Sequence, residues 1–165
     1  MTISKSIENA FNEQINAELF SSYLYLSMSA YFSANNLTGF ASWFTIQAQE
    51  EVEHAMKMYK FVLERGGKIT LKTINAPKAD FKNTLEIVEE AYKHELLVTS
   101  LITKLYETSL SEKDYASANF LKWFIDEQVE EEANTSQLVE WVKMTEGKAS
   151  TLMMVDHQMS KRAKD

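Results

Sequence analysis

The sequence has no cysteine, and its 165 residues include only one proline and four glycines. Without cysteine the chain cannot form a disulfide, a thiolate zinc site, an iron–sulfur cluster or a thiol nucleophile. So few helix breakers favour long uninterrupted helices and argue against an all-β fold.

The chain also lacks an excess of positive charge and lacks long apolar runs. Its net charge is −7, which is unfavourable for contacts with nucleic-acid phosphates. The first residues, MTISKSIENAF, contain no apolar signal-peptide core, and runs such as LMMV at 152–155 are too short to span a bilayer. We therefore predict a cytoplasmic protein that binds neither nucleic acid nor membrane.

Apolar periodicity between the breakers predicts four long helices and a short fifth one. The first runs from about Ser6 to Ala34, the second from Thr38 (a candidate N-cap) to Gly66–Gly67, the third from Asn83 or Thr84 to Leu110–Ser111, the fourth from Glu112 to Gly147, and the fifth from Ala149 to Lys161. Short gaps place consecutive helices antiparallel.

The segment GKITLKTINAPKADFK, 67–82, is the exception, because it contains the only proline and has no helical pattern. A helix of about 28 residues is ~42 Å long, and about 16 extended residues reach ~50 Å. The segment can therefore cross the whole bundle and start the third helix parallel to the second. The predicted fold is all-α, a four-helix bundle with a long crossover and a short fifth helix, in one domain over 1–165.

Each long helix has an apolar stripe that is interrupted by polar residues near its middle. The interruptions are Glu18 in the first helix, Glu51 and His54 in the second, Glu95 in the third, and Gln128 and Glu131 in the fourth. Helices of similar length that pack side by side bring their midpoints to one level. The polar residues should therefore meet inside the bundle.

Four buried carboxylates would repel one another and take up protons unless a cation neutralised them. No Lys or Arg lies on the stripes at that level, so a metal ion is the expected partner. Carboxylates with one imidazole favour iron or manganese over calcium and over a structural zinc site. A single Glu-x-x-His is more often a solvated helix face, and only the four interruptions together favour the metal.

The residues that carry this pattern resemble the ferritins, most closely the bacterial non-haem ferritins. The resemblance covers essentially the whole chain and rests on NEQINAELFSSYLY (12–25), AQEEVEHAMKMY (48–59), YKHE (92–95) and NFLKWFIDEQVEEE (119–132). It implies the ferritin-like fold, iron storage in a hollow 24-subunit shell, and oxidation of Fe(II) by O₂ or peroxide at a dinuclear centre within each subunit.

The same resemblance implies roles for individual residues. Glu18 and His54 would bind the first iron, Glu51 would bridge both irons, and Glu95 and Glu131 would bind the second. The fourth helix has Gln128-x-x-Glu131 where other ferritin-like di-iron proteins carry a second Glu-x-x-His.

Several further residues have two readings. Gln128 would be a hydrogen-bond partner or a weak oxygen ligand, and Tyr25 would orient a carboxylate or be an ordinary core residue. Glu50, Glu127 and Glu130 match a third iron site on the cavity side or form a solvated acidic face. Val52 stands where bacterioferritins carry a haem-ligating methionine, so no haem is expected.

Other readings and assignments complete the expectations. The chain could be another di-iron carboxylate protein, such as a peroxidase or an oxygenase-like scaffold, or a helical binding module whose acidic level is solvated. The related miniferritins place iron between subunits, which a complete ligand set within one chain argues against. We assign His94 to the surface and the tail KRAKD to a solvated end. Five apolar residues of the first helix lie off its stripe and suggest a second buried interface: Phe20, Tyr23, Leu24, Met28 and Tyr31.

Overall fold

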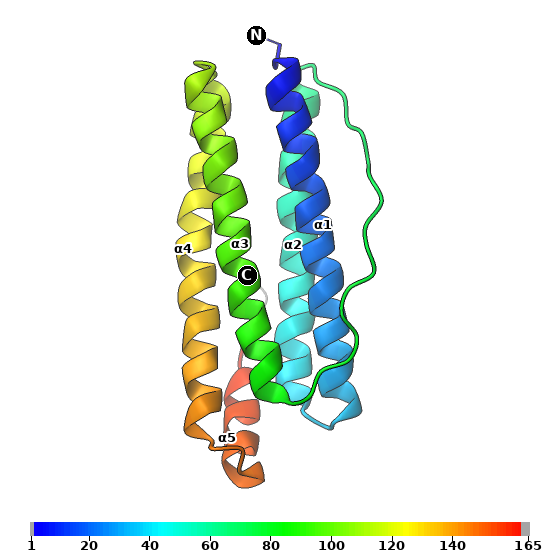
Figure 1. Cartoon of the computed structure of the whole chain (residues 1–165), viewed down its shortest axis with the longest axis vertical. Coiled ribbons are helices and arrows are strands. Elements are labelled where there is room, and N and C mark those ends of the chain that lie inside the picture. The colour runs from blue at the N-terminus through cyan, green and yellow to red at the C-terminus, as the bar shows by residue number, and fades with distance from the viewer. Residues whose placement is uncertain (1, 163–165) are drawn as a thin grey trace.

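Four long helices lie side by side, and a fifth packs against one end of them (Figure 1). The computed structural model describes residues 2–162. The helices are α1 Lys5–Ala34, α2 Thr38–Glu64, α3 Thr84–Ser111, α4 Tyr115–Met144 and α5 Ala149–Met159. α1 and α2 form one antiparallel hairpin, α3 and α4 form another, and α3 runs parallel to α2. The predicted four-helix bundle with a short fifth helix is confirmed.

The helix starts follow local capping chemistry, with two departures from the prediction. The side chains of Asn83 and Asp114 accept hydrogen bonds from the first turns of α3 and α4. α4 therefore begins at Tyr115 and not at Glu112. Thr38 is not an N-cap, because Leu37 holds that position and no side chain caps α2.

The crossover runs along the outside of α1 from one end of the bundle to the other (Figure 1). Polar side chains of α1 hold its backbone. Asn12 Nδ2 donates to the Lys68 carbonyl at 2.9 Å, and Asn12 Oδ1 accepts from the Thr70 N–H at 2.7 Å. Further along, Ser27 Oγ donates to the Lys78 carbonyl at 2.6 Å. These bonds satisfy backbone groups that a strand would otherwise pair.

The apolar interior consists of two clusters, one toward each end of the bundle. One cluster contains Phe32, Phe40, Phe44, Ile87 and Leu138, and the other contains Phe11, Met58, Ile102, Leu121 and Phe124. On every long helix the mid-helix polar residues lie between a stretch that belongs to one cluster and a stretch that belongs to the other. The bundle therefore has a polar level between two apolar cores, as the interrupted stripes predict.

α5 packs against the start of α2. The Phe40 N–H donates to Asp156 Oδ1 at 2.9 Å, and a Cβ added to Gly39 would lie 1.8 Å from the Asp156 carbonyl oxygen. Met159 is buried at the end of α5. Glycine at position 39 thus allows a close approach of two backbones, and this approach directs the segment after α5 toward α2.

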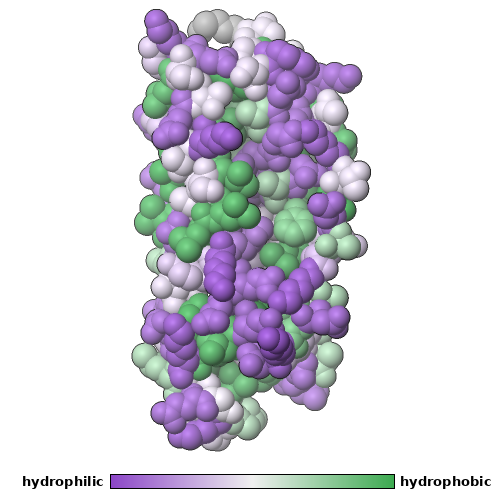
Figure 2. All heavy atoms as spheres, viewed as in Figure 1, coloured by the Kyte–Doolittle hydropathy of each residue, from purple (hydrophilic) through white to green (hydrophobic). Residues whose placement is uncertain are grey.

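The residues assigned to a second interface differ in exposure, because some are exposed and others are buried within this chain. The face in Figure 2 is mainly hydrophilic, with separate apolar areas. Tyr23 is 50% exposed, but Leu24 and Met28 belong to the core of this chain. Those two residues are therefore not available to an interface, because α1 buries more than the one stripe that was considered. Within residues 2–162 no helix has the length and hydrophobicity needed to span a membrane.

Candidate metal centre

The five residues predicted to bind the two irons all reach the interior at the polar level. The exposed fractions are 1% for Glu18, 2% for Glu51, 5% for His54, 1% for Glu95 and 4% for Glu131. The first three come from the α1–α2 hairpin and the other two from the α3–α4 hairpin. The site thus lies between the two hairpins.

Glu18, Glu51 and His54 form the closest group. His54 Nδ1 is 3.4 Å from Glu51 Oε2 and 3.8 Å from Glu18 Oε2, and one ligand atom from each residue lies within 4.8 Å of the others. Glu18 Oε2 is buried and accepts no hydrogen bond from any group within residues 2–162. A buried carboxylate oxygen without a donor is costly unless a cation faces it. The group therefore fits a metal ion.

Glu95 and Glu131 lie opposite this group and are held by neutral donors. The Tyr25 hydroxyl donates to Glu95 Oε1, and Gln128 Nε2 donates to Glu95 Oε2 at 3.2 Å. Gln47 Nε2 donates to Glu131 Oε2 at 2.7 Å and reaches Glu51 Oε1 at 3.4 Å. Tyr25 thus contacts a candidate ligand, as its orienting role requires, and the amide nitrogen of Gln128, rather than its oxygen, faces the site.

Burial and mutual repulsion govern the ionisation of the carboxylates. Burial raises the pKa of Glu51 and of Glu95, and burial together with the charge of Glu95 raises the pKa of Glu131 to about 8. The metal-free site therefore retains protons near neutrality. A bound cation would favour the ionised carboxylates and release those protons.

His54 and Glu18 behave differently because they face each other. Burial lowers the pKa of His54, but the carboxylates of Glu18 and Glu51 outweigh it and raise the pKa to about 11. Burial raises the pKa of Glu18, but its interactions with neighbouring side chains, His54 first among them, bring the pKa below the ordinary value. In the metal-free protein a proton on His54 thus takes the place of a cation.

The structure adds two glutamines that the sequence analysis did not assign to the site. Gln14 Nε2 donates to Glu18 Oε1 at 2.7 Å, and Gln47 contacts Glu51 and Glu131. Each glutamine precedes a glutamate of its own helix by four residues, a spacing that places the two side chains on one face. This Gln-x-x-x-Glu spacing in α1 and α2 was the available signal.

His94 does not lie on the surface, contrary to its assignment. Its Nε2 lies 2.7 Å from Ser21 Oγ, and its ring meets that of Tyr25 edge to face at a centroid distance of 5.8 Å. Burial lowers the pKa of His94, which favours the neutral imidazole. The prediction failed because α1 packs over this side of α3. His94 therefore packs against the ring of Tyr25, whose hydroxyl donates to Glu95.

Three other acidic residues were assigned to a third iron site or to a solvated face. Glu50, Glu127 and Glu130 line one pocket of ≈ 260 Å³ together with His54 and Trp123. Glu127 is half-buried and Glu130 is exposed. His54 also lines this pocket, so the pocket borders the buried group, and it is compatible with either reading.

Comparison with known proteins agrees with this geometry. Residues 8–145 match the model of the ferritin-like domain. The bacterial non-heme ferritin of Bacteroides fragilis is 40% identical over 97% of this chain and 99% of its own length, and that of Staphylococcus epidermidis is 35% identical over 98% and 97%. The open-pore ferritin of the archaeon Archaeoglobus fulgidus superposes with a TM-score of 0.97 at 43% identity, covering 98% of this chain and 100% of its own.

These relatives match the chain over nearly its full length, so they include all four helices that supply the polar level. The resemblance inferred from the motifs is confirmed. With its buried carboxylates and histidine between two helical hairpins, the chain belongs to the ferritin family.

Proposed function

We propose that this chain is an iron-storage protein that oxidises Fe(II), with O₂ or peroxide as the oxidant, at two adjacent iron positions inside one subunit. The observation that carries the proposal is the buried group of Glu18, Glu51 and His54, in which one Glu18 oxygen accepts no hydrogen bond from the described part of the chain. Membership of the ferritin family supports storage and iron oxidation. We further propose that residues 1–165 form one domain that carries no haem.

Fe(II) is the substrate, and the proposed ligands divide between the hairpins. Glu18 and His54 bind the first ion, Glu51 bridges both ions, and Glu95 and Glu131 bind the second. The 3.4 Å separation of His54 Nδ1 from Glu51 Oε2 supports a shared first position. Tyr25 and Gln128 hold Glu95, and Gln47 holds Glu131, so the carboxylates are oriented before iron arrives.

Carboxylate oxygens favour oxidation because they stabilise Fe(III) more than Fe(II). Two Fe(II) ions give two electrons to one O₂, which takes up two protons and becomes hydrogen peroxide. With peroxide as the oxidant, two electrons and two protons yield two water molecules. The protons that Glu131 and Glu51 hold in the metal-free site leave when Fe(II) binds, which allows proton release to be measured separately from oxidation.

Glu50, Glu127 and Glu130 are proposed as a third, weaker iron position beside the pocket that reaches His54. Their joint lining of that pocket supports the assignment, and its competitor is a solvated acidic face. Divalent-cation titration distinguishes the two, since a solvated face adds no third saturable site.

Storage requires a container, and we propose a homo-oligomeric shell of 24 subunits in the cytoplasm. Exposed apolar side chains support association, including Leu71 at 68%, Met153 at 68% and Met154 at 71%. Native mass spectrometry should give several hundred kDa, against 19.0 kDa for one chain. A monomer or dimer would exclude storage and favour a helical binding module.

The activity is tested by anaerobic loading with Fe(II) and rapid mixing with O₂, followed by absorbance of Fe(III). The double variant Glu51→Ala/His54→Ala should lose rapid oxidation, whereas Glu64→Ala, an exposed control on the same helix, should keep it. Equal rates in all three proteins would show that the buried level is not the oxidation site. Oxidation that instead requires an added organic substrate would indicate an oxygenase or peroxidase.

A further inference from the structure

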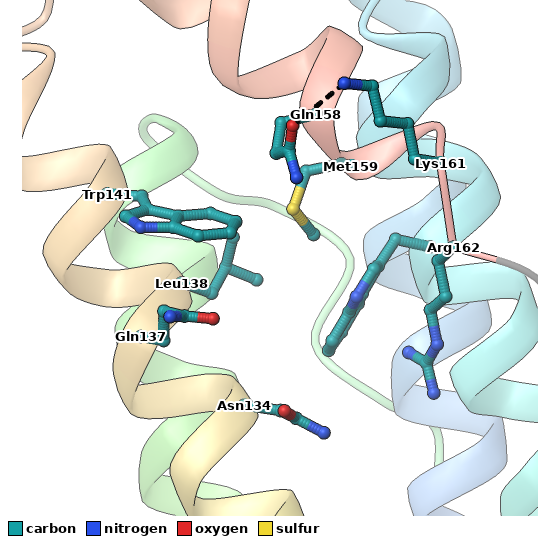
Figure 3. Close-up of a pocket in the computed structure, with 9 residues that line it drawn as sticks. Asn134, Gln137, Leu138, Trp141, Gln158, Met159, Lys161 and Arg162 are labelled. Atoms are coloured by element: carbon teal, nitrogen blue, oxygen red, sulfur yellow. Dashed lines mark hydrogen bonds between the residues drawn. The ribbon is translucent and has the colours of Figure 1, made fainter.

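Arg162 follows α5, and its side chain reaches Gln47, the residue that donates a hydrogen bond to the proposed ligand Glu131. It lines a pocket of ≈ 390 Å³ between α4 and the segment after α5. Figure 3 shows that Lys161 and Arg162 leave this segment in opposite directions. Lys161 contacts Gln158 at 3.2 Å, whereas Arg162 contacts α2. The expectation of a solvated tail is therefore wrong for Arg162, and residues 163–165 of that tail lie outside the described residues.

The guanidinium of Arg162 makes three contacts with successive turns of α2. Its Nη1 donates to Gln47 Oε1 at 2.8 Å, its Nη2 forms an ion pair with Glu50, and its Cζ lies 4.5 Å from the centre of the Trp43 ring. The exposed fractions of the Arg162 and Glu50 side chains are 20% and 18%. The planar fork of the guanidinium offers Gln47 and Glu50 donors on two separate nitrogens, whereas a lysine would have to reach both residues from one ammonium nitrogen.

Gln47 connects Arg162 to the metal centre. Because the amide oxygen of Gln47 accepts from Arg162, its amide nitrogen faces Glu131 at 2.7 Å and Glu51 at 3.4 Å. The charge of Arg162 also opposes the effect of burial on the pKa of Glu131. Loss of the Arg162 contact would remove the hydrogen bond that holds the amide oxygen of Gln47, so the amide would hold Glu131 less firmly.

Glu50 connects the same side chain to the acidic pocket. It lines that pocket with Glu127 and Glu130, and a cation bound there would have to share or replace the Arg162 ion pair. The positive charge of Arg162 would repel such a cation, and the ion pair would have to break before Glu50 could coordinate it.

We propose that the guanidinium of Arg162 competes with a divalent metal ion for Glu50. Through Gln47 it also positions Glu131 in the inner metal centre, the buried two-metal site between the hairpins. The inference rests on the proposed function and adds a residue that controls loading of the site. It makes the segment after α5 part of the metal centre rather than a passive end of the chain.

The test is a titration of the iron-free full-length protein with Co²⁺, followed by calorimetry and by the visible spectrum of the bound ion. Removal of the competitor in Arg162→Ala should strengthen the weakest of three sites about tenfold, because both the ion pair and the repulsion are lost. Lys161→Ala removes the same charge from the neighbouring residue and should bind as the wild type does. Native mass must match that of the wild type in each variant.

Arg162→Lys separates the two parts of the proposal. It retains the charge beside Glu50 and should leave the third site weak, but it loses the fork to Gln47 and should change the spectrum of the two inner Co²⁺ ions. An unchanged third-site affinity in Arg162→Ala would overturn the competition, and a spectrum of the two buried Co²⁺ ions that is unchanged in both Arg162→Lys and Arg162→Ala would overturn the positioning. If Glu51→Ala/His54→Ala bound Co²⁺ as the wild type does, the proposed function itself would fail.

Discussion

Replacement of Glu131 with glutamine should stabilise the metal-free protein near neutral pH, although it removes a proposed ligand. Glu131 is 4% exposed, and burial with the charge of Glu95 raises its pKa from 4.5 to about 8. The folded protein must therefore retain a proton that the unfolded chain releases above pH 4.5. Glutamine is neutral throughout, and its side-chain oxygen can still accept the hydrogen bond from Gln47.

The sign follows from the raised pKa. Below pH 4.5 both states carry the proton, and the variant has no advantage. As the pH rises toward 8, the wild type loses about 1.4 kcal/mol of stability per pH unit, a cumulative loss of ~3 kcal/mol by pH 7. Because Glu95 and Glu131 share the repulsion, we expect about 2 kcal/mol at pH 7. For a chain of this size that is roughly 4–8 °C in melting temperature.

The assay is scanning calorimetry in the presence of a chelator at pH 5, 6 and 7, with Glu130→Gln as an exposed neighbouring control. The advantage of Glu131→Gln should grow with pH, whereas the control should show no such trend. Saturating Co²⁺ should reverse the order, because the wild type gains an ionised ligand. A variant that melts below the wild type at pH 7 without metal, or an advantage independent of pH, would refute the reasoning.

Three further predictions follow from single contacts. Tyr25→Phe removes a donor to the buried Glu95, so it should lower stability by about 1–3 kcal/mol and slow iron oxidation in stopped-flow measurements; an unchanged rate would contradict the orienting role. Asp114→Asn weakens the pair with Arg65, whose two nitrogens lie 3.0 and 3.1 Å from its oxygens, and should cost about 1–2 kcal/mol at pH 7 by calorimetry. Burial raises the pKa of Asp114, but the hydrogen bonds from Arg65 outweigh it and hold the pKa below 3.8. The stability cost of Asp114→Asn should therefore disappear as the solution is acidified through that range. A cost that persists at that acidity would exclude the ion pair as its source. Gly39→Ala places a Cβ 1.8 Å from a carbonyl oxygen of α5 and should undock that helix, which limited proteolysis after α4 would detect; cleavage at the wild-type rate would show that the contact is dispensable.

The helices and the level of the site could be predicted because both depend on local sequence. Four stripes with a period near 3.6, bounded by asparagine and glycine, define long helices, and residues near the helix midpoints must share a level. Glu18, Glu51 and Glu95 were identified because each is a carboxylate within an apolar stripe. The length of segment 67–82 fixed the direction of α3.

The partners of the ligands could not be predicted in the same way, because they depend on how one helix rotates against another. The position of His94 beside Tyr25 requires the packing angle of α1 on α3. The contact of Arg162 with α2 depends on the course of the chain after α5, which is set by the close approach at Gly39. Neither the helical period nor the capping chemistry contains this information.

The division of the site between two hairpins also has a consequence for the order of folding. Each hairpin closes a short loop and can form early, whereas docking of one hairpin on the other requires the long crossover to be placed along α1. Glu18 and Glu51 already share the α1–α2 hairpin, but they meet Glu95 and Glu131 of the other hairpin only in this last step. An ion bound between the hairpins thus acts as a late cross-link, which slows their separation but leaves the formation of each hairpin unchanged. Iron loading would then protect the subunit chiefly by lengthening its lifetime before unfolding.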